Sequence, residues 1–340
     1  MCSRGASFLT CFGRDILPSD VISSRDRFRI KRMFRYFQTG KARRGVKRWI
    51  KEHRALRYVR LLQPEPRLWG REAGDLPSFL IIGAQRSGST FLHDRLQQKT
   101  SASGSPLQKE IHYFDSKYYR SLAWYARFFD PLEERTGATA TFEASPYYLY
   151  HPAVPKRIHE SLPDVKVVAA LRNPVDRTVS QYQWIRDRNL EVRGPEEAFQ
   201  YDAERLHWEQ EPSYLKRFEN PLYFDFDHIH YGYLRRSLYH IQLQRWQEWF
   251  PPSQIRVVGS QRLFEHPDDV IGELVEFLGL ERSENAKHER VNQNSPREKV
   301  PVPEEARDIA RRHLEDVIAR TESVLTDQMI LGNHSSLHWT

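Results

Sequence analysis

Residues 79–90 read FLIIGAQRSGST, a short apolar run followed by a loop that has glycine near both ends. Four consecutive apolar residues, Phe79 to Ile82, are typical of a strand that is buried on both faces of a parallel sheet. A helical pattern follows from Thr90 to about Gln98. A loop between such a strand and its helix directs backbone N–H groups and the positive end of the helix at one point, which suits a phosphate.

The same strand-and-helix unit recurs later in the chain. Residues 165–171 form a second apolar run, and Pro174 stands at the first position of a helix that we expect to reach about Asp187. A third apolar run covers residues 255–258. It stands between two segments with helical patterns, Leu234–Phe250 and Asp268–Leu278. Strands that alternate with helices of this length predict an α/β fold, with a parallel sheet and helices on both faces.

Composition indicates a folded protein without disulfides. The 340 residues are 39% hydrophobic and 12% aromatic, which excludes a wholly disordered chain or a fibrous repeat. Cys2 and Cys11 are the only cysteines, too few for a four-cysteine zinc site, and they fit a reducing compartment. We find neither a signal peptide nor an apolar run long enough to span a membrane, and we therefore expect a cytoplasmic protein.

The basic character of the chain lies in one segment. Residues 25–60 contain 15 Lys or Arg against two acidic residues, whereas the net charge of the whole chain is only +7. This concentration of charge argues against a general nucleic-acid surface, and we expect no nucleic-acid partner. Gly40 and Gly45 divide the segment into two expected helices. They are either solvated basic helices packed on the domain or a contact for anionic lipid or another polyanion.

The pattern predicts three regions. Residues 1–75 form a basic helical extension and a linker, residues 76–325 form the main domain, and residues 326–340 form a tail. Within the domain, residues 189–230 interrupt the alternation with three prolines and many aromatic residues. We interpret this stretch as an insertion over the active face.

The first loop differs from the nucleoside-triphosphate loop GxxxxGK[ST]. Ser89 occupies the position of the essential lysine, and the only cation of the loop is Arg86. The second strand ends in Leu171-Arg172 and brings no aspartate for magnesium. A kinase of the P-loop type is therefore a distant alternative, and an ordinary Gly/Ser turn is the other interpretation.

A second candidate anion site follows the second strand. Arg172 stands at the carboxyl end of that strand, where ligands of open α/β sheets gather, and Ser180 follows about two helical turns later. An arginine at a strand end is more often a surface ion-pair partner when it stands alone. Together with the first loop, however, the motif indicates a ligand with two separated anionic groups.

These motifs resemble those of sulfotransferases that use 3′-phosphoadenosine 5′-phosphosulfate. Gly83–Thr90 resembles their 5′-phosphosulfate loop, and Arg172 with Ser180 resembles their 3′-phosphate motif. Three further segments resemble the heparan sulfate 3-O- and N-sulfotransferase branch: Lys109–Asp115, Glu143–Tyr148 and Tyr239–Trp246. The resemblance covers about Phe79 to Leu280 and extends through residues 294–297.

The resemblance implies a P-loop-like sulfotransferase fold and a 3′-phosphoadenosine 5′-phosphosulfate donor, with no metal required. The donor-binding residues that it implies are Gln85, Arg86, Ser87, Gly88, Ser89, Thr90, Arg172, Ser180 and Arg297. The acceptor would be a hydroxyl group, or an amine, of a carbohydrate. A small-molecule or lipid acceptor is an alternative, and a non-catalytic module that binds polyanions or membranes is an alternative of another class. The oligomeric state is left open.

The resemblance also implies catalytic roles. Arg86 would stabilise the leaving phosphate, and Glu110 would act as the general base. His112 would share a strand face with Glu110 and assist it. The alternatives are a surface carboxylate paired with Lys109 and a packed structural histidine. Aromatic pairs at residues 118–119, 124–125 and 147–148 could stack on sugar rings, although most such residues belong to cores.

Two positions depart from the pattern that the resemblance suggests. The related sequences usually have lysine where this chain has Arg86, and the heparan branch usually has lysine where this chain has Ala144. An arginine can stabilise negative charge, but its planar group does not occupy a lysine site identically. The disulfide and the Golgi anchor typical of the animal branch are also missing, which favours a bacterial or otherwise cytoplasmic relative.

Overall fold

The computed structural model describes residues 65–134, 137–283, 301–331, 337 and 339. All of them except Glu65 belong to one compact unit that begins at Pro66. The basic segment 25–60 and Arg297 lie outside the described residues. The first described residues, within the expected linker, contact the domain: Leu68 is buried and the Nε atom of Arg71 donates a hydrogen bond of 3.0 Å to the carbonyl of Arg127.

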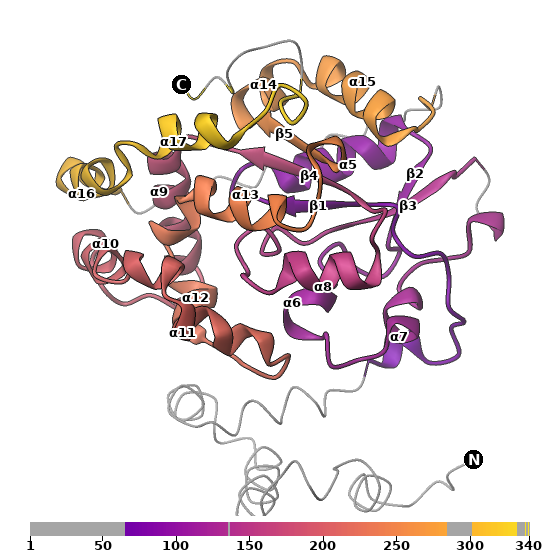
Figure 1. Cartoon of the computed structure of the whole chain (residues 1–340), viewed down its shortest axis with the longest axis horizontal. Helices are drawn as coiled ribbons and strands as arrows, with labels where there is room; N and C mark the ends of the chain where they lie inside the picture. Colours follow the sequence, from indigo (N-terminus) through magenta and orange to yellow (C-terminus); the bar gives the residue numbers. More distant parts are fainter. Residues whose placement is uncertain (1–64, 135–136, 284–300, 332–336, 338, 340) are drawn as a thin grey trace, which may run out of the picture. The chain divides into compact units, whose positions relative to one another are not determined.

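A five-stranded parallel sheet forms the centre of this unit (Figure 1). The spatial order is β2-β3-β1-β4-β5. The strands are β1 (Phe79–Gly83), β2 (Ala102–Gly104), β3 (Ala140–Ala144), β4 (Lys166–Leu171) and β5 (Ile255–Gly259). Strand β1 is central, with Leu80 opposite Glu143 of β3 on one side and Val167 of β4 on the other. The three predicted strands are confirmed, and β2 and β3 are additional.

Helices cover both faces of the sheet, as predicted. Leu80 and Ile82 of β1 belong to one buried cluster, and the alternate residues Phe79 and Ile81 belong to the other. The first cluster includes side chains of α8 (Val154–Ser161), α9 (Pro174–Arg186) and α13 (Tyr239–Gln247). The second includes side chains of α5 (Ser89–Lys99), α14 (Ser260–Glu265) and α15 (Pro267–Leu278). The continuous apolar run of β1 is therefore explained by burial on both sides.

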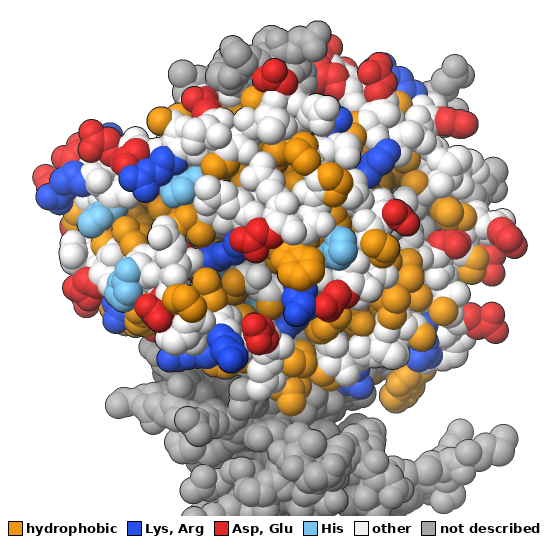
Figure 2. Space-filling view, in the orientation of Figure 1, with side chains coloured by type: hydrophobic (Ala, Val, Ile, Leu, Met, Phe, Trp, Pro, Cys, Tyr) orange, Lys and Arg blue, Asp and Glu red, His pale blue; other side chains and the backbone are white. Residues whose placement is uncertain are grey.

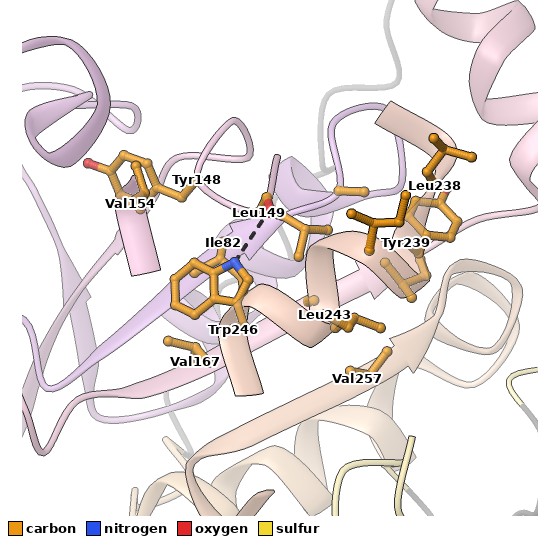
Figure 3. Close-up of a cluster of buried hydrophobic side chains, with 14 of the residues drawn as sticks. Ile82, Tyr148, Leu149, Val154, Val167, Leu238, Tyr239, Leu243, Trp246 and Val257 are labelled. Atoms are coloured by element: carbon orange, nitrogen blue, oxygen red, sulfur yellow. Dashed lines mark hydrogen bonds between the residues drawn. The ribbon is translucent and has the colours of Figure 1, made fainter. Parts of the chain in front are cut away.

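Trp246 fixes α13 against the sheet (Figure 3). Its indole is fully buried, and its Nε1 atom donates a hydrogen bond of 3.4 Å to the carbonyl of Leu149. In the close-up, Ile82 and Val167 from two adjacent strands lie beside it, and Val257 of the next strand lies near Leu243 of the same helix. The satisfied N–H group allows this large side chain to be buried without the cost of an unpaired donor.

The remaining helices occur in the segments between the strands and after β5. They are α6 (Tyr113–Ser116), α7 (Leu122–Ala126), α10 (Pro195–Ala203), α11 (Pro212–Leu215), α12 (Phe226–His230), α16 (Glu304–Leu314) and α17 (Val317–Val324). Short 3₁₀ turns cover Pro66–Leu68, Leu132–Glu134, Leu206–Gln210, Lys216–Glu219, Arg235–Ser237 and Pro252–Gln254. Helix α16 packs on α9 and α10, and α17 packs on α13. In the expected helix Leu234–Phe250, the Arg235–Ser237 turn precedes α13.

The end of the chain contacts the sheet and the loop after β4. The amide of Val257 donates a hydrogen bond of 2.7 Å to the carbonyl of Met329, and Leu331 donates one of 2.9 Å back to Val257. Farther on, the side-chain amide of Asn173 donates a hydrogen bond of 3.0 Å to the carbonyl of Trp339. Residues of the expected tail thus extend the edge of β5 and reach one of the candidate site motifs.

Charged side chains of both signs are interspersed on the face of the molecule seen in Figure 2. Hydrophobic side chains lie between them, and no single basic field covers this view. Among the described residues, no helix is both long and apolar enough to cross a membrane.

Candidate functional site

The loop between β1 and α5 has the conformation of an anion cradle. Gly88 adopts φ 97°, and Arg86 adopts φ 72°. A Cβ atom added at Gly88 would lie 3.1 Å from the ring of Phe264, so glycine is favoured there by conformation and by space. Helix α5 begins at Ser89, and the N–H groups of its first turn have no acceptor within the helix. They and the helix dipole favour an anion at this point.

Arg86 crosses from this loop to α9. Its Nε atom lies 3.1 Å from the Oγ atom of Ser180. Burial lowers the pKa of Arg86, and the charges of Arg188 and Arg172 lower it further. The Arg86 guanidinium is therefore repelled by two others, and a bound anion would relieve this repulsion. The structure brings together Arg86 and Ser180, which the sequence predicted as separate halves of one site.

A second cation reaches the loop from outside it. The Nζ atom of Lys109 donates a hydrogen bond of 2.7 Å to the Oγ1 atom of Thr90, in the first turn of α5. Burial lowers the pKa of Lys109, although Glu110 and Asp94 oppose this effect. From the sequence, Lys109 was expected only as a partner of Glu110. In the structure its ammonium group also lies beside the first turn of α5.

Arg172 follows directly after β4, at the carboxyl edge of the sheet. The next residue, Asn173, caps α9: its Oδ1 atom accepts hydrogen bonds from Val175 and Asp176. The hydroxyl of Tyr239 donates a hydrogen bond of 2.9 Å to the carbonyl of Arg172. These contacts fix the backbone on both sides of the Arg172 side chain.

Gln85 links the loop to the insertion. Its Oε1 atom accepts a hydrogen bond from Arg236, which also donates to the carbonyls of His228 and Ile229 in α12. The Arg236 guanidinium is buried and lies 4.9 Å from the ring centroid of Tyr147. Arg236 was not predicted as a site residue. Its hydrogen bond to Gln85 fixes the Gln85 side chain and so helps to hold the loop after β1 in place.

Glu110, His112 and Asp115 form a chain of contacts. The Nε2 atom of His112 lies 3.3 Å from Glu110 Oε2, and its Nδ1 atom lies 2.6 Å from Asp115 Oδ2. Burial disfavours the imidazolium, but the carboxylates of Asp115 and Glu110 outweigh burial and raise the pKa of His112 to about 10. Burial would raise the pKa of Glu110, but His112 and Lys109 lower it below its ordinary value. Glu110 is therefore ionised near neutral pH, as a base must be.

One expected feature of this segment is wrong. Glu110 and His112 do not share a strand face, because they lie in the loop before α6. His112 has φ 60°, and this left-handed residue turns the chain so that its imidazole lies between two carboxylates. Lys109 does pair with Glu110 at 3.6 Å, as the alternative interpretation expected, yet Glu110 contacts His112 as well.

Of the six aromatic residues proposed as sugar platforms, three are structural, and the other three, at positions 118, 119 and 124, are half-buried. Tyr125 and Tyr148 are fully buried, and Tyr147 is nearly so. Tyr125 stacks on Tyr113 with 4.5 Å between ring centroids. These rings fill the core beside the Glu110 loop, where a sugar ring could not reach them.

Asp115 and Glu143 were also missed as site residues. Asp115 stands one helical turn after His112, and that spacing could have revealed it. Glu143 is buried under the Glu110 loop, and no spacing along the chain could have shown this contact. Ala144, which replaces a lysine of the related sequences, is fully buried in the core. Among the described residues, no cluster of three or more His, Cys, Asp or Glu is arranged to hold a metal ion.

Comparison with known proteins identifies the fold and the relatives. A family model described as the sulfotransferase domain matches residues 76–308. In the solved structure of a sulfotransferase from Alicyclobacillus acidocaldarius, 96% of that chain aligns with 74% of this one, with a TM-score of 0.55 and 24% identity. At this level of identity the likeness establishes the fold.

Three relatives are similar in sequence to part of this chain. The membrane-associated sulfotransferase kil1 of Dictyostelium discoideum is 28% identical over 266 residues, covering 60% of this chain and 56% of that protein. Human heparan sulfate glucosamine 3-O-sulfotransferase 6 is 31% identical over 215 residues, covering 62% and 55%. Human bifunctional heparan sulfate N-deacetylase/N-sulfotransferase 2 is 31% identical over 222 residues, covering 63% and 23%. The chain thus spans between 23% and 56% of the length of these relatives.

Proposed function

This chain belongs to the sulfotransferase domain family, and we propose that it moves a sulfuryl group from 3′-phosphoadenosine 5′-phosphosulfate to a hydroxyl group of a carbohydrate. The observation that carries the proposal is the contact between Arg86 and Ser180. It joins the loop after β1 to the helix after β4, so the two candidate anion-binding motifs lie side by side. A ligand with phosphate groups at two positions fits this arrangement.

The residues present suit the donor. Gly88 allows close approach to the backbone, and the first turn of α5 offers N–H groups to the 5′-phosphosulfate. Lys109 brings positive charge to that end, and Arg172 with Ser180 would hold the 3′-phosphate. Arg86, which stands in the loop and contacts Ser180, lies between the two motifs. When bound, the donor supplies a sulfuryl group attached to a phosphate oxygen.

The protein's side chains have two roles in the proposed reaction. They accept the proton of the acceptor and stabilise the negative charge on the leaving phosphate. Glu110 is ionised and would take the proton of the acceptor hydroxyl while the acceptor oxygen forms its bond to sulfur. His112, held by Asp115 at 2.6 Å, orients the Glu110 carboxylate and keeps its pKa low. Arg86 and the end of α5 would stabilise the charge that remains on the phosphate oxygen as its bond to sulfur breaks. Positioning and electrostatics therefore supply the catalysis.

The carbohydrate acceptor rests on the relatives. Two of the three relatives described above carry heparan sulfate in their names, and that substrate class is the first to test. Small-molecule and lipid acceptors remain alternatives within the same chemistry. A module that only binds polyanions would use the basic segment 25–60 in place of the site described above.

Ligand binding by the full chain is the first experiment. We expect 3′-phosphoadenosine 5′-phosphate to raise the melting temperature and adenosine 5′-phosphate to do so far less, because only the first engages both motifs. A chain without residues 1–60 should retain this response. A response to heparin alone, lost in salt and lost with residues 1–60, would instead identify a polyanion-binding module.

Transfer is then measured with a radiolabelled sulfuryl donor. Desulfated polysaccharides, small phenols and sterols serve as acceptors in parallel. Label in a polysaccharide supports the proposal, and label only in a phenol or sterol moves the enzyme to the small-molecule class. Donor binding without transfer to any acceptor would contradict the catalytic role of Glu110.

A further inference from the structure

Glu143, on β3, is buried beneath the loop that carries Glu110 and His112. We propose that Glu143 is a positioning residue that holds this loop in the conformation needed for proton transfer. The inference rests on the proposed function, because it concerns the residues that would act on the acceptor. Its structural part can be tested without a transfer assay.

The Glu143 side chain is 1% exposed and is surrounded by donors. Tyr125 donates its hydroxyl to Oε2 at 2.5 Å, and Tyr148 donates to the two oxygens at 3.0 and 3.1 Å. Ser145 donates its hydroxyl to Oε1 at 2.5 Å. A buried carboxylate is tolerated when it is fully hydrogen-bonded, and these hydroxyls provide much of that compensation.

The carboxylate also accepts backbone N–H groups from the catalytic loop. Its Oε1 atom accepts hydrogen bonds from Ile111 at 3.0 Å and from His112 at 3.3 Å. The amide of His112 also donates to Ser145 Oγ at 3.3 Å. The amide of Phe114 donates at 3.3 Å to the Tyr148 hydroxyl, which itself bonds Glu143. Three amides within residues 111–114 therefore end on Glu143 or on its direct partners.

This loop needs such an anchor because of its backbone. His112 is a non-glycine residue with φ 60°, a conformation that L-residues adopt at an energetic cost and that persists only where the surroundings impose it. The amide of the strained residue is the one held by Glu143 and Ser145. The same residue places its two ring nitrogens on Glu110 and Asp115. A change in this backbone conformation would therefore disconnect the proposed base from its partner.

The position of Glu143 in the sheet makes the anchor rigid. Strand β3 lies between β2 and β1, with Leu80 of β1 directly opposite Glu143. The neighbouring residues of β3, Phe142 and Ala144, point into the core on the opposite face. The loop is thus attached to an interior strand of the sheet and not only to neighbouring loops. Among the described residues, Glu143 makes its hydrogen bonds to residues 111, 112, 125, 145 and 148 and none to the loop 83–90, Arg172 or Ser180, so its role differs from that of Arg86 or Arg172.

The test measures hydrogen exchange of single amides in the full chain. In Glu143→Leu, which has similar volume but no acceptor, we expect the amides of Ile111 and His112 to exchange at least tenfold faster. The amides of Phe79 to Ile82 in β1 should keep their rates. Ser145→Ala, a smaller change, should accelerate His112 more than Ile111, because Ser145 contacts only the former amide. Glu143→Gln retains one acceptor oxygen and should lie between wild type and Glu143→Leu.

The kinetic readout separates positioning from general instability. In single turnover with saturating donor, Glu143→Leu should slow transfer at least tenfold, and Glu143→Gln should restore part of the rate. The dissociation constant of 3′-phosphoadenosine 5′-phosphate should stay within twofold of the wild-type value. Glu191→Leu is the matched control: Glu191 is also buried and accepts the amides of Val192 and Arg193 and the hydroxyl of Tyr233, but in the insertion. It should leave the exchange at Ile111 and His112 unchanged.

Each outcome decides a different question. Wild-type exchange at Ile111 and His112 in a folded Glu143→Leu protein, or equal effects of Glu143→Leu and Glu191→Leu on that exchange, would overturn the positioning role. If Glu143→Leu does not fold, wild-type exchange at His112 in both Ser145→Ala and Glu143→Gln overturns it. A wild-type protein that neither binds 3′-phosphoadenosine 5′-phosphate nor transfers sulfuryl would overturn the proposed function, whereas the exchange result would still decide the anchor.

Discussion

The Nε atom of Arg86 lies 3.1 Å from the Oγ atom of Ser180, although 94 residues separate them in the sequence. The contact spans the carboxyl edge of the sheet, from the loop after β1 to the helix after β4. With Arg172 and Arg188 also close to Arg86, positive charge is concentrated where the two motifs meet. The roles of the two motifs can therefore be separated by changing one residue at a time.

Replacement of Arg172 by alanine should weaken donor binding by about 2 to 3 kcal/mol, the scale of a charged hydrogen bond. The substitution leaves in place the backbone carbonyl that accepts the Tyr239 hydroxyl. Calorimetric titration with 3′-phosphoadenosine 5′-phosphate measures the loss, and Arg307→Ala, which removes a cation paired with Asp176 of α9, serves as control. If the wild type bound adenosine 5′-phosphate equally well, the 3′-phosphate assignment would be wrong.

Replacement of Arg86 by alanine should lower turnover about 10²- to 10³-fold, the effect of losing one group that stabilises developing charge. Donor affinity should fall much less, because Lys109 and the first turn of α5 still hold the same end. Arg86→Lys should retain substantial activity, since an ammonium group can supply the charge. A folded but inactive lysine variant would show that the site requires the guanidinium fork.

Replacement of Glu110 by glutamine should cut turnover by about 10²- to 10⁴-fold, the range for loss of a general base. The amide preserves the shape of the carboxylate, and donor binding should hardly change because Glu110 faces the acceptor in the proposed mechanism. Glu133→Gln, an exposed change in the turn at Leu132–Glu134, is the control. A chelator should leave wild-type turnover unchanged; loss of activity on chelation would contradict the metal-free mechanism.

The pH profile should report the contact between His112 and Glu110. Protonated His112 lowers the pKa of Glu110, so the acidic limb of wild-type turnover should lie below pH 4.5, the ordinary value for glutamate. In His112→Gln the cation is absent, the pKa of Glu110 rises, and the acidic limb should move to higher pH. Because the pKa of His112 is about 10, the wild type should also lose activity as pH rises through that value. An unchanged acidic limb in the variant would show that Glu110 does not act as the base.

The fold was predictable where strands are apolar and regular. Phe79–Ile82 and residues 167–171 are buried and apolar at every position, so the pattern is plain. Strand β2 has only three small residues, Ala102–Gly104, and strand β3 contains the buried carboxylate of Glu143. Such strands are stabilised by their neighbours, and their own residues predict little.

The two motifs of the candidate site could be recognised in the sequence, but the contacts that join them to other segments could not. The loop 83–90 and Arg172 are recognisable because backbone turns and strand ends require particular residues. By contrast, the hydrogen bonds from Lys109 to Thr90 and from Arg236 to Gln85 join distant segments, and no local pattern records them. The left-handed conformation of His112 was missed for the same reason, since its anchor lies on β3.

The attachment of residues 329–331 to β5 and of Trp339 to Asn173 determines when the protein can mature during translation. Strand β5 ends at Gly259, but Leu331, the last residue that pairs with it, is made 72 residues later. At ribosomal rates of about 5 to 20 residues per second, β5 exists for roughly 4 to 14 s before that partner has been made. For that interval the nascent chain carries an unfinished edge strand, which is the kind of surface that chaperones bind. Arrested chains that end before residue 329 should therefore be far more sensitive to protease than the 340-residue chain.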